Sequence, residues 1–209
     1  APIQPDVKKK TKYWLLGFAL FFAGFVLLNV LAYNHAHTMT HFTFAGSRTH
    51  KPERLSFLAK VKVLLVGVNL PRPASDRSPA ELRADCRSLT ITGPGNVTLA
   101  AWYVDQGIGT PLVILFHGYA TEKTRLLQES RVLLDLGASV LLVDFRGSGG
   151  SSESCTTIGV DESEDVAAVV RYTQDHLRHA SVILFGQSMG AVAILRAVHA
   201  LGIKPDAVI

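Results

Sequence analysis

The longest apolar stretch of the chain runs from Tyr13 to Tyr33 and contains no charged residue. It is 21 residues long, and an α-helix needs about 20 residues to cross the hydrocarbon core of a bilayer. Tyr13, Trp14 and Tyr33 lie at its two ends, where amphipathic rings favour the headgroup region. The pattern predicts a transmembrane anchor over residues 13–33. A cleaved signal peptide is the alternative, but its apolar part is usually only about 7–15 residues long.

Basic residues are distributed unevenly about this stretch. Four lysines lie within residues 8–12, whereas Arg48 is the first lysine or arginine on the other side. The positive-inside rule therefore predicts that residues 1–12 form a basic tail in the cytoplasm and that the rest of the chain lies outside it, in the periplasm if the cell is bacterial. Because these lysines supply the net charge of +4, that charge does not indicate nucleic-acid binding.

Residues 34–79 are expected to form a juxtamembrane linker. Its first part, up to Arg54, carries four histidines, but no acidic or cysteine residue stands at a spacing typical of a metal site, so we expect no bound metal. Residues 55–70 have one apolar helical face, with Lys60 and Lys62 outside it, and are too short to span a bilayer. Two positions are open for this amphipathic segment: packed on the globular domain, or lying in the membrane interface.

The remaining residues, 80–209, alternate between strand and helix patterns. Leu89–Thr92 and Val97–Val104 flank a Gly-Pro-Gly-Asn turn and predict an antiparallel hairpin. Unbroken apolar runs, typical of strands buried on both faces of a parallel sheet, follow at Leu112–Phe116, Val140–Phe145 and Val182–Phe185, and a further run begins at Ala207. Helical patterns lie between these runs, at residues 122–136, 161–176 and 189–201. This alternation predicts an α/β domain with a mostly parallel sheet that helices cover on both faces.

Two of the helical patterns carry more detailed expectations. Thr121 stands where a residue caps the start of the first helix. The third pattern, residues 189–201, is apolar almost all round, and its polar exceptions are Arg196 and His199. A helix that is apolar on every side is usually buried, so we expect this one to lie deep in the domain.

The candidate chemistry centres on the segment Gly186-Gln187-Ser188-Met189-Gly190. The string G-x-S-x-G is weak by itself, but here it directly follows an apolar strand and precedes an apolar helix, which is the setting of a nucleophile elbow. Such a turn strains the serine backbone, exposes the hydroxyl at a helix N-terminus and needs flanking glycines because space is short. Ser188 is therefore the predicted nucleophile of an acyl-transfer site.

A second motif, His117-Gly118-Tyr119-Ala120, follows an earlier strand. An acyl-transfer site needs two backbone N–H groups that face the oxyanion, and the predicted donors are those of Met189 and Tyr119. His117 precedes the nucleophile in the chain, whereas the base of such a site follows it. We therefore expect His117 to shape the loop rather than to act as the base.

A third motif, DFRGSGGS at residues 144–151, contains several glycines after an apolar run. It does not match the dinucleotide pattern G-x-G-x-x-G, because Ser152 occupies the position of the last glycine. We therefore interpret it as a structural loop at the carboxyl edge of the sheet. No metal or organic cofactor is expected.

The segments FHGYA, DFRGSGGS and GQSMG, in this order and at these separations, resemble the α/β-hydrolase superfamily. More closely, the chain is similar to bacterial single-span, membrane-anchored serine hydrolases related to monoacylglycerol lipases and serine aminopeptidases. The resemblance covers about Leu89 to Ile209 and implies an α/β-hydrolase fold. It also implies hydrolysis of a carboxylic ester or amide, in a small molecule or lipid, through an acyl-enzyme on Ser188. Esterase or lipase activity is expected ahead of peptidase activity, because a membrane-tethered site meets lipids readily.

The chain departs from this superfamily in one respect. A later Asp or Glu and a late His complete the triad of its members, yet only 21 residues follow Ser188. The acid and base among them are Asp206 and His199. His199 falls within a predicted helix and Asp206 opens the next strand away from the site, so neither fits the role. We therefore expect the hydrolase domain to be C-terminally incomplete in this sequence and the chain to be inactive alone.

Two questions stay open at this point. A non-catalytic membrane protein that uses the same fold as a binding or scaffold module is the alternative to an enzyme, since a fold does not by itself imply a function. The intact elbow and oxyanion loop favour the enzyme. Cys86 and Cys155 are the two cysteines, and both a disulfide and two free thiols are compatible with an extracytoplasmic domain.

The lysine asymmetry predicts the direction in which the chain crosses the membrane. We expect alkaline phosphatase joined after Ile209 to be active, because the enzyme matures only outside the cytoplasm, and green fluorescent protein at the same place to be dark. Replacing the four lysines of residues 8–12 by glutamine should lower the phosphatase signal. If the green fluorescent protein fusion were fluorescent and the phosphatase fusion inactive, the predicted orientation in the membrane would be reversed.

Overall fold

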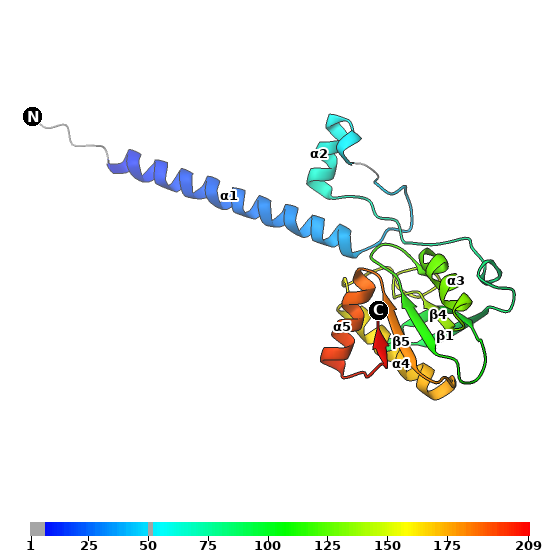
Figure 1. Cartoon of the computed structure of the whole chain (residues 1–209). Coiled ribbons are helices and arrows are strands. Elements are labelled where there is room, and N and C mark those ends of the chain that lie inside the picture. Colours follow the sequence, from blue (N-terminus) through cyan, green and yellow to red (C-terminus); the bar gives the residue numbers. More distant parts are fainter. Residues whose placement is uncertain (1–6, 50–51) are drawn as a thin grey trace, which may run out of the picture. The chain divides into compact units, whose positions relative to one another are not determined.

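The computed structural model describes residues 7–49 and 52–209 (Figure 1). The chain divides into two compact units. The first comprises Ala1–Met39 with Thr49–Val68, and the second comprises Thr40–Arg48 with Asn69–Ile209. Half of the predicted basic tail, residues 1–6, lies outside the described residues.

The first unit is dominated by helix α1, Val7–Thr40. Within the described ranges, one helix is long and apolar enough to cross a membrane, and it is the Lys10–Thr40 part of α1. The helix continues seven residues past Tyr33, into the first part of the segment expected to form the linker. The physical reason is that these seven residues include no Pro or Gly, and extending an existing helix is far easier than starting one.

Helix α2, Phe57–Val66, lies within the predicted amphipathic segment. It begins at an N-cap serine, Ser56, whose hydroxyl accepts a hydrogen bond from the Ala59 N–H, and it ends at Gly67, whose φ is 88°. None of the residues of α2 is buried.

The second unit contains a six-stranded sheet in the order β1-β2-β4-β3-β5-β6. Its strands are β1 (Arg87–Thr92), β2 (Thr98–Val104), β3 (Leu112–Phe116), β4 (Ser139–Val143), β5 (Val182–Gly186) and β6 (Ala207–Val208). β1 and β2 form the predicted antiparallel hairpin, and β2 is also antiparallel to β4. The remaining neighbours, β4-β3-β5-β6, are parallel, as the unbroken apolar runs predicted.

Three α-helices cover the two faces of this sheet: α3 (Leu127–Asp135), α4 (Asp161–His176) and α5 (Met189–Leu201). α4 and α5 pack with one face, where Leu99, Ile114 and Leu141 belong to the same buried cluster as Val166 and Ile194. α3 packs with the other face. The predicted three-layer α/β arrangement is confirmed (Figure 1). Short 3-10 turns occupy Pro52–Arg54, Pro79–Glu81, Pro94–Asn96 and Lys123–Leu126.

Two details of the helices differ from expectation. The helix expected at residues 122–136 starts as a 3-10 turn and is capped by Glu122, not Thr121, because the Glu122 carboxylate accepts from the Thr124 N–H while the Thr121 hydroxyl donates to the Gly118 carbonyl. α5 is buried on one side only, and Leu195 on its other side is 61% exposed. Sequence pattern reports how apolar a helix is, but not whether a neighbouring element covers it.

A buried ion pair ties the loop after β3 to the loop after β4. The Lys123 Nζ lies 2.5 Å from the Asp144 carboxylate, and both side chains are more than nine-tenths buried. Asp144 also accepts hydrogen bonds from the backbone N–H groups of Lys123 (2.8 Å) and Gly150 (2.9 Å). The Lys123 ammonium in turn lies 4.8 Å from the centre of the Trp102 ring, a cation–π distance. This pair holds both loops at the carboxyl edge of the sheet.

Removal of one partner of this pair should be costly. We expect Asp144→Asn to lower the free energy of unfolding by about 3–5 kcal/mol, because Lys123 would be left buried without a counter-charge. The exposed pair between Arg87 and Asp105, at 3.8 Å, supplies the control, and Asp105→Asn should cost under about 1 kcal/mol. Urea denaturation of the detergent-solubilised protein, followed by circular dichroism, measures both. Equal losses would show that the buried pair does not hold the loops.

Candidate active site

Ser188 occupies the turn between β5 and α5. Its backbone has φ 51° and ψ −111°, a conformation that an L-residue adopts only under strain. The residue is exposed, whereas Met189 and Gly190, which follow it, are buried. The strand-turn-helix setting predicted for an elbow is thus present, with the serine side chain accessible at the N-terminus of α5, where the helix dipole favours negative charge.

The two glycines of the motif lie where no side chain fits. A Cβ atom at Gly186 would come within 2.5 Å of the Ala191 backbone nitrogen, and one at Gly190 would collide with the carbonyl groups of Phe116 and His117. The start of α5 therefore crosses β3 at backbone contact. This close approach explains why the sequence needs glycine at both positions.

The predicted oxyanion loop lies against this turn. A Cβ atom at Gly118 would be 3.4 Å from the Gln187 carbonyl oxygen and 3.6 Å from the Ser188 Cβ, so the loop after β3 touches the serine residue. Tyr119 follows directly, and its ring lies 6.4 Å from that of Phe42. Met189 is the first residue of α5, and its backbone N–H therefore has no partner inside the helix. Tyr119 thus follows the glycine that touches Ser188, and Met189 directly follows Ser188 in the chain.

His117 is fully buried and connects two loops. Its Nδ1 donates to the Gly118 carbonyl at 2.8 Å, and its Nε2 accepts from the Phe145 N–H at 3.1 Å. Both ring nitrogens are therefore used in a neutral imidazole. Burial lowers the pKa of His117, which also favours the neutral form. These contacts agree with the expectation that His117 shapes the loop.

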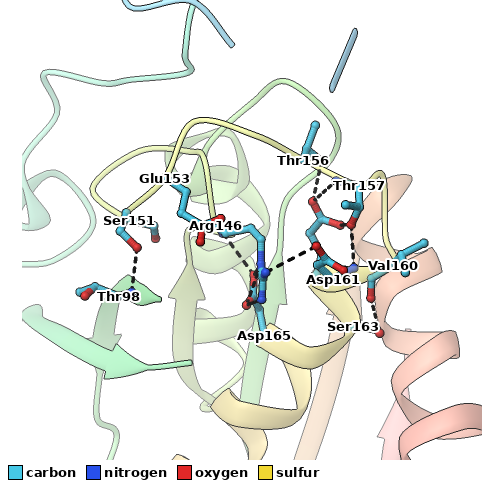
Figure 2. Close-up of polar contacts among 12 residues, drawn as sticks. Thr98, Arg146, Ser151, Glu153, Thr156, Thr157, Val160, Asp161, Ser163 and Asp165 are labelled. Atoms are coloured by element: carbon cyan, nitrogen blue, oxygen red, sulfur yellow. Dashed lines mark hydrogen bonds and ion pairs between the residues drawn. The ribbon is translucent and has the colours of Figure 1, made fainter. Parts of the chain in front are cut away.

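A second charged cluster holds the DFRGSGGS loop against α4. Figure 2 shows the Arg146 guanidinium reaching both Asp165 and Asp161. Its Nη2 lies 2.7 Å from the Asp165 carboxylate, and its Nη1 lies 3.6 Å from that of Asp161. The Asp165 carboxylate also accepts from the Arg146 backbone N–H at 3.2 Å. The motif is thus a structural loop at the carboxyl edge of β4, as the sequence suggested.

Glu162 organises the segment that follows this loop. Its carboxylate is buried and accepts hydrogen bonds from the Thr156 hydroxyl (2.5 Å), the Thr157 hydroxyl (2.9 Å) and the Gly159 N–H (2.7 Å). Burial works to raise the pKa of Glu162, but these hydrogen bonds outweigh it and leave the pKa lowered. The Thr156 hydroxyl also lies 3.5 Å from the Met189 sulfur. The network therefore packs against one of the two candidate oxyanion residues.

The other residues considered from the sequence lie away from Ser188. His199 is exposed on α5, and Asp206 accepts a hydrogen bond from the Val182 N–H at the opposite end of β5 from the elbow. Cys86 and Cys155 are free thiols. In the parts of the chain that the structure describes, no cluster of His, Cys, Asp or Glu is arranged to hold a metal ion.

No sequence pattern pointed directly to Lys123, Glu162 and Asp165 as partners in these clusters. Each sits in a segment whose pattern indicates a surface helix, where acidic and basic residues are ordinary. Asp144 was the available signal, because a carboxylate directly after a buried strand must find partners at the sheet edge.

Comparisons with known proteins show what this chain is similar to. A sequence model of the serine aminopeptidase family S33 matches residues 110–209. The uncharacterised protein YqkD of Bacillus subtilis is 34% identical over 84 residues, which are 40% of this chain and 28% of that protein. The esterase Pf2001 of Pyrococcus furiosus has a similar structure, with a TM-score of 0.56 and 31% identity over 63% of this chain and 54% of the esterase.

A protein of Mycobacterium tuberculosis is also similar, at 30% identity over 107 residues that make up 50% of this chain and 38% of that protein. The chain thus spans between 28% and 54% of the length of these three relatives. Together with the sheet order and the strained serine turn, these similarities show that the chain has an α/β-hydrolase fold.

Proposed function

We propose that the protein is a serine hydrolase that cleaves carboxylic esters through an acyl-enzyme on Ser188. The observation that carries the proposal is the strained, exposed turn at Ser188 between β5 and α5, with the Gly118 loop in contact with it. Positive φ at a non-glycine residue is costly, and it persists where the surrounding structure enforces it, commonly at functional sites.

In the proposed reaction the Ser188 oxygen attacks the ester carbonyl carbon, and a base takes the hydroxyl proton. The carbonyl oxygen becomes an oxyanion, which accepts hydrogen bonds from the Tyr119 and Met189 N–H groups. The alcohol leaves with a proton from the protonated base, and water then hydrolyses the acyl-enzyme. The resemblance assigns the base to a histidine late in the hydrolase domain, and no residue from 189 to 209 is proposed for this role.

An ester is favoured over an amide by two observations. Pf2001, the structural relative described above, is an esterase. A chain with a membrane-spanning segment also meets lipid esters at short range. The family model that matches residues 110–209 is named for an aminopeptidase, so peptide hydrolysis is the second candidate.

We also propose that α1 anchors the protein in a bilayer with its N-terminus in the cytoplasm and the hydrolase unit outside it. The support is a helix without Asp, Glu, Lys or Arg from Tyr13 to Thr40, preceded by the lysines of residues 8–12. Trp14 and Tyr33, both highly exposed, stand where the headgroup regions would begin and end.

The same bilayer is the proposed partner of α2. Its large apolar side chains are exposed: Phe57, Leu58, Leu64, Leu65 and Val66. The carbonyl groups near its C-terminus accept hydrogen bonds from the Asn34 side chain (to Leu65, 3.3 Å) and the His35 ring (to Leu64, 2.8 Å). Asn34 and His35 directly follow the predicted span, so α2 is tied to α1 at the level of the membrane surface. An apolar helix there gains free energy by lying in the interface.

The first test concerns the nucleophile. We expect the protein with its complete triad to react with a fluorescent fluorophosphonate probe, because the probe reports an activated serine. In that protein, Ser188→Ala should lower the labelling rate at least about 1,000-fold. The control is Ser88→Ala, on the exposed side of edge strand β1, which should label like the wild type. Undiminished labelling of Ser188→Ala would remove Ser188 from its role and favour a binding or scaffold protein.

The second test measures how deep α2 lies in lipid. Nitroxide labels at Phe57→Cys and Lys62→Cys, in a background with Cys86 and Cys155 replaced by serine, stand about 140° apart around the helix. In liposomes we expect the label at residue 57 to be accessible to oxygen and shielded from a water-soluble nickel chelate, and the label at residue 62 to show the reverse. A label at Leu20→Cys reports the anchor. If the label at residue 20 contacted lipid while the labels at residues 57 and 62 were equally accessible, the interfacial position of α2 would be wrong. The proposed anchor would still stand.

A further inference from the structure

A basic cavity opens beside the candidate active site. Its volume is about 480 Å³, and three arginines, Arg48, Arg72 and Arg125, line it. The residues that follow Tyr119 in the oxyanion loop, Ala120 and Thr121, form part of its wall. This volume is within the range of ligand pockets, which is about 300–1,000 Å³.

The cavity is close enough to Ser188 to hold part of the same substrate. Gly118 stands within van der Waals reach of the Ser188 Cβ, with an ideal Cβ separation of 3.6 Å. Two residues of extended chain span at most about 7 Å. The wall at Ala120 is therefore at most roughly 12 Å from the serine side chain, a limit that an acyl chain of up to about nine carbons would reach.

The three arginines are not equivalent. Arg72 is committed to the fold, because its guanidinium donates to the carbonyl groups of Gly149 (2.8 Å), Glu153 (3.0 Å) and Ser151. Arg48 and Arg125, by contrast, are exposed at the rim of the cavity. Among the described residues, Arg48 contacts only the Ala120 carbonyl, at 3.4 Å, and neither rim arginine has an acidic partner in an ion pair.

One carboxylate lies in the lining, and it is already satisfied. Glu122 is buried and accepts from the Thr124 N–H at 2.7 Å and the Thr124 hydroxyl at 2.5 Å. The lining therefore carries two more positive charges than negative ones, from three arginines and one glutamate. A concave site with an excess of one sign of charge concentrates ligands of the opposite sign.

The segment that presents Arg48 is held in place. The Asn69 side chain donates to the Ser47 carbonyl at 2.9 Å and accepts from the Thr43 hydroxyl at 3.0 Å. Thr43 and Pro71 form a bridge with backbone hydrogen bonds on either side. Arg48 also lies near the Tyr119 phenol. Burial raises the pKa of this phenol, and the positive charge of Arg48 acts in the opposite direction. The backbone that carries Arg48 is thus held beside the oxyanion loop.

We propose that this cavity, with Arg48 and Arg125, binds an anionic group, a carboxylate or a phosphate, on the part of the ester substrate remote from the reacting carbonyl. Arginine suits this role because its planar guanidinium pairs with both groups through two parallel hydrogen bonds. The proposal rests on the hydrolase function proposed above. It extends that function by naming a class of substrate, an ester that carries a negative charge within about nine carbons of the bond that is cleaved.

The test uses two matched esters and the whole protein. Mono-p-nitrophenyl glutarate and p-nitrophenyl pentanoate share a leaving group and an acyl length, but only the first carries a carboxylate. We expect Arg48→Gln and Arg125→Gln each to lower the charged-to-neutral ratio of kcat/KM about 10-fold, the effect of losing one charge-assisted hydrogen bond. Arg178→Gln is the control, since Arg178 is exposed before β5 at the opposite edge of the sheet, and it should leave the ratio unchanged.

Direct binding gives a measurement that needs no catalysis. Calorimetry with glutarate and with sn-glycerol 3-phosphate, on the wild type and the same variants, shows which anion the cavity prefers. We expect at least one of them to bind, and Arg48→Gln to weaken that binding about 10-fold. Binding of neither anion, or binding that Arg178→Gln weakens equally, overturns the inference.

The two proposals fail in different ways. If Ser188→Ala hydrolyses both esters as fast as the wild type, the proposed nucleophile is wrong, and the calorimetry alone decides the anion site. If hydrolysis depends on Ser188 while the charged-to-neutral ratio is the same in Arg48→Gln, Arg125→Gln and the wild type, the anion site is wrong and the hydrolase proposal stands.

Discussion

The close crossing of α5 over the end of β3 is the constraint from which the geometry of the candidate site follows. Gly190 lies so near the carbonyl groups of Phe116 and His117 that no side chain fits between them. The chain must therefore turn from β5 into α5 within two residues, and this turn leaves Ser188 with positive φ and an exposed side chain. The same crossing brings Gly118 against the serine. One backbone contact thus places both the proposed nucleophile and the loop proposed to stabilise its oxyanion.

Buried carboxylates keep the surrounding loops in register with that crossing. Asp144, Glu162 and Asp165 are each fully buried, and each accepts hydrogen bonds from a backbone N–H as well as from a side chain. A buried carboxylate without such partners would destabilise the fold by roughly several kcal/mol. Loop conformations that break these hydrogen bonds are therefore disfavoured. The loops after β3 and β4 at the carboxyl edge of the sheet are thus held in place, which an acyl-transfer site needs because its oxyanion donors must be in place before the reaction.

Charged side chains that lie exposed at the cavity complement the buried ones. The acids around the elbow are satisfied within the fold, whereas Arg48 and Arg125 keep exposed guanidinium groups at a cavity beside it. The first unit, in contrast, exposes apolar side chains along α1 and α2. An apolar surface in one unit and a basic cavity in the other are the two features on which the proposed binding of a bilayer and of an anionic ester rests.

The sequence by itself determined the elements whose signal is local. β3, α4 and α5 have the predicted bounds, because each is an apolar or amphipathic pattern bounded by clear breaks. The turn at Ser188 was predictable because the motif and its strand and helix are contiguous. Only the tertiary structure decided which face of α5 is covered. The same holds for the ion pair between Lys123 and Asp144 and for the contact of Arg48 with Ala120, which lies 72 residues further along the chain. These contacts depend on how parallel strands are ordered in the sheet, and strand order is set by packing between distant segments, which no local pattern records.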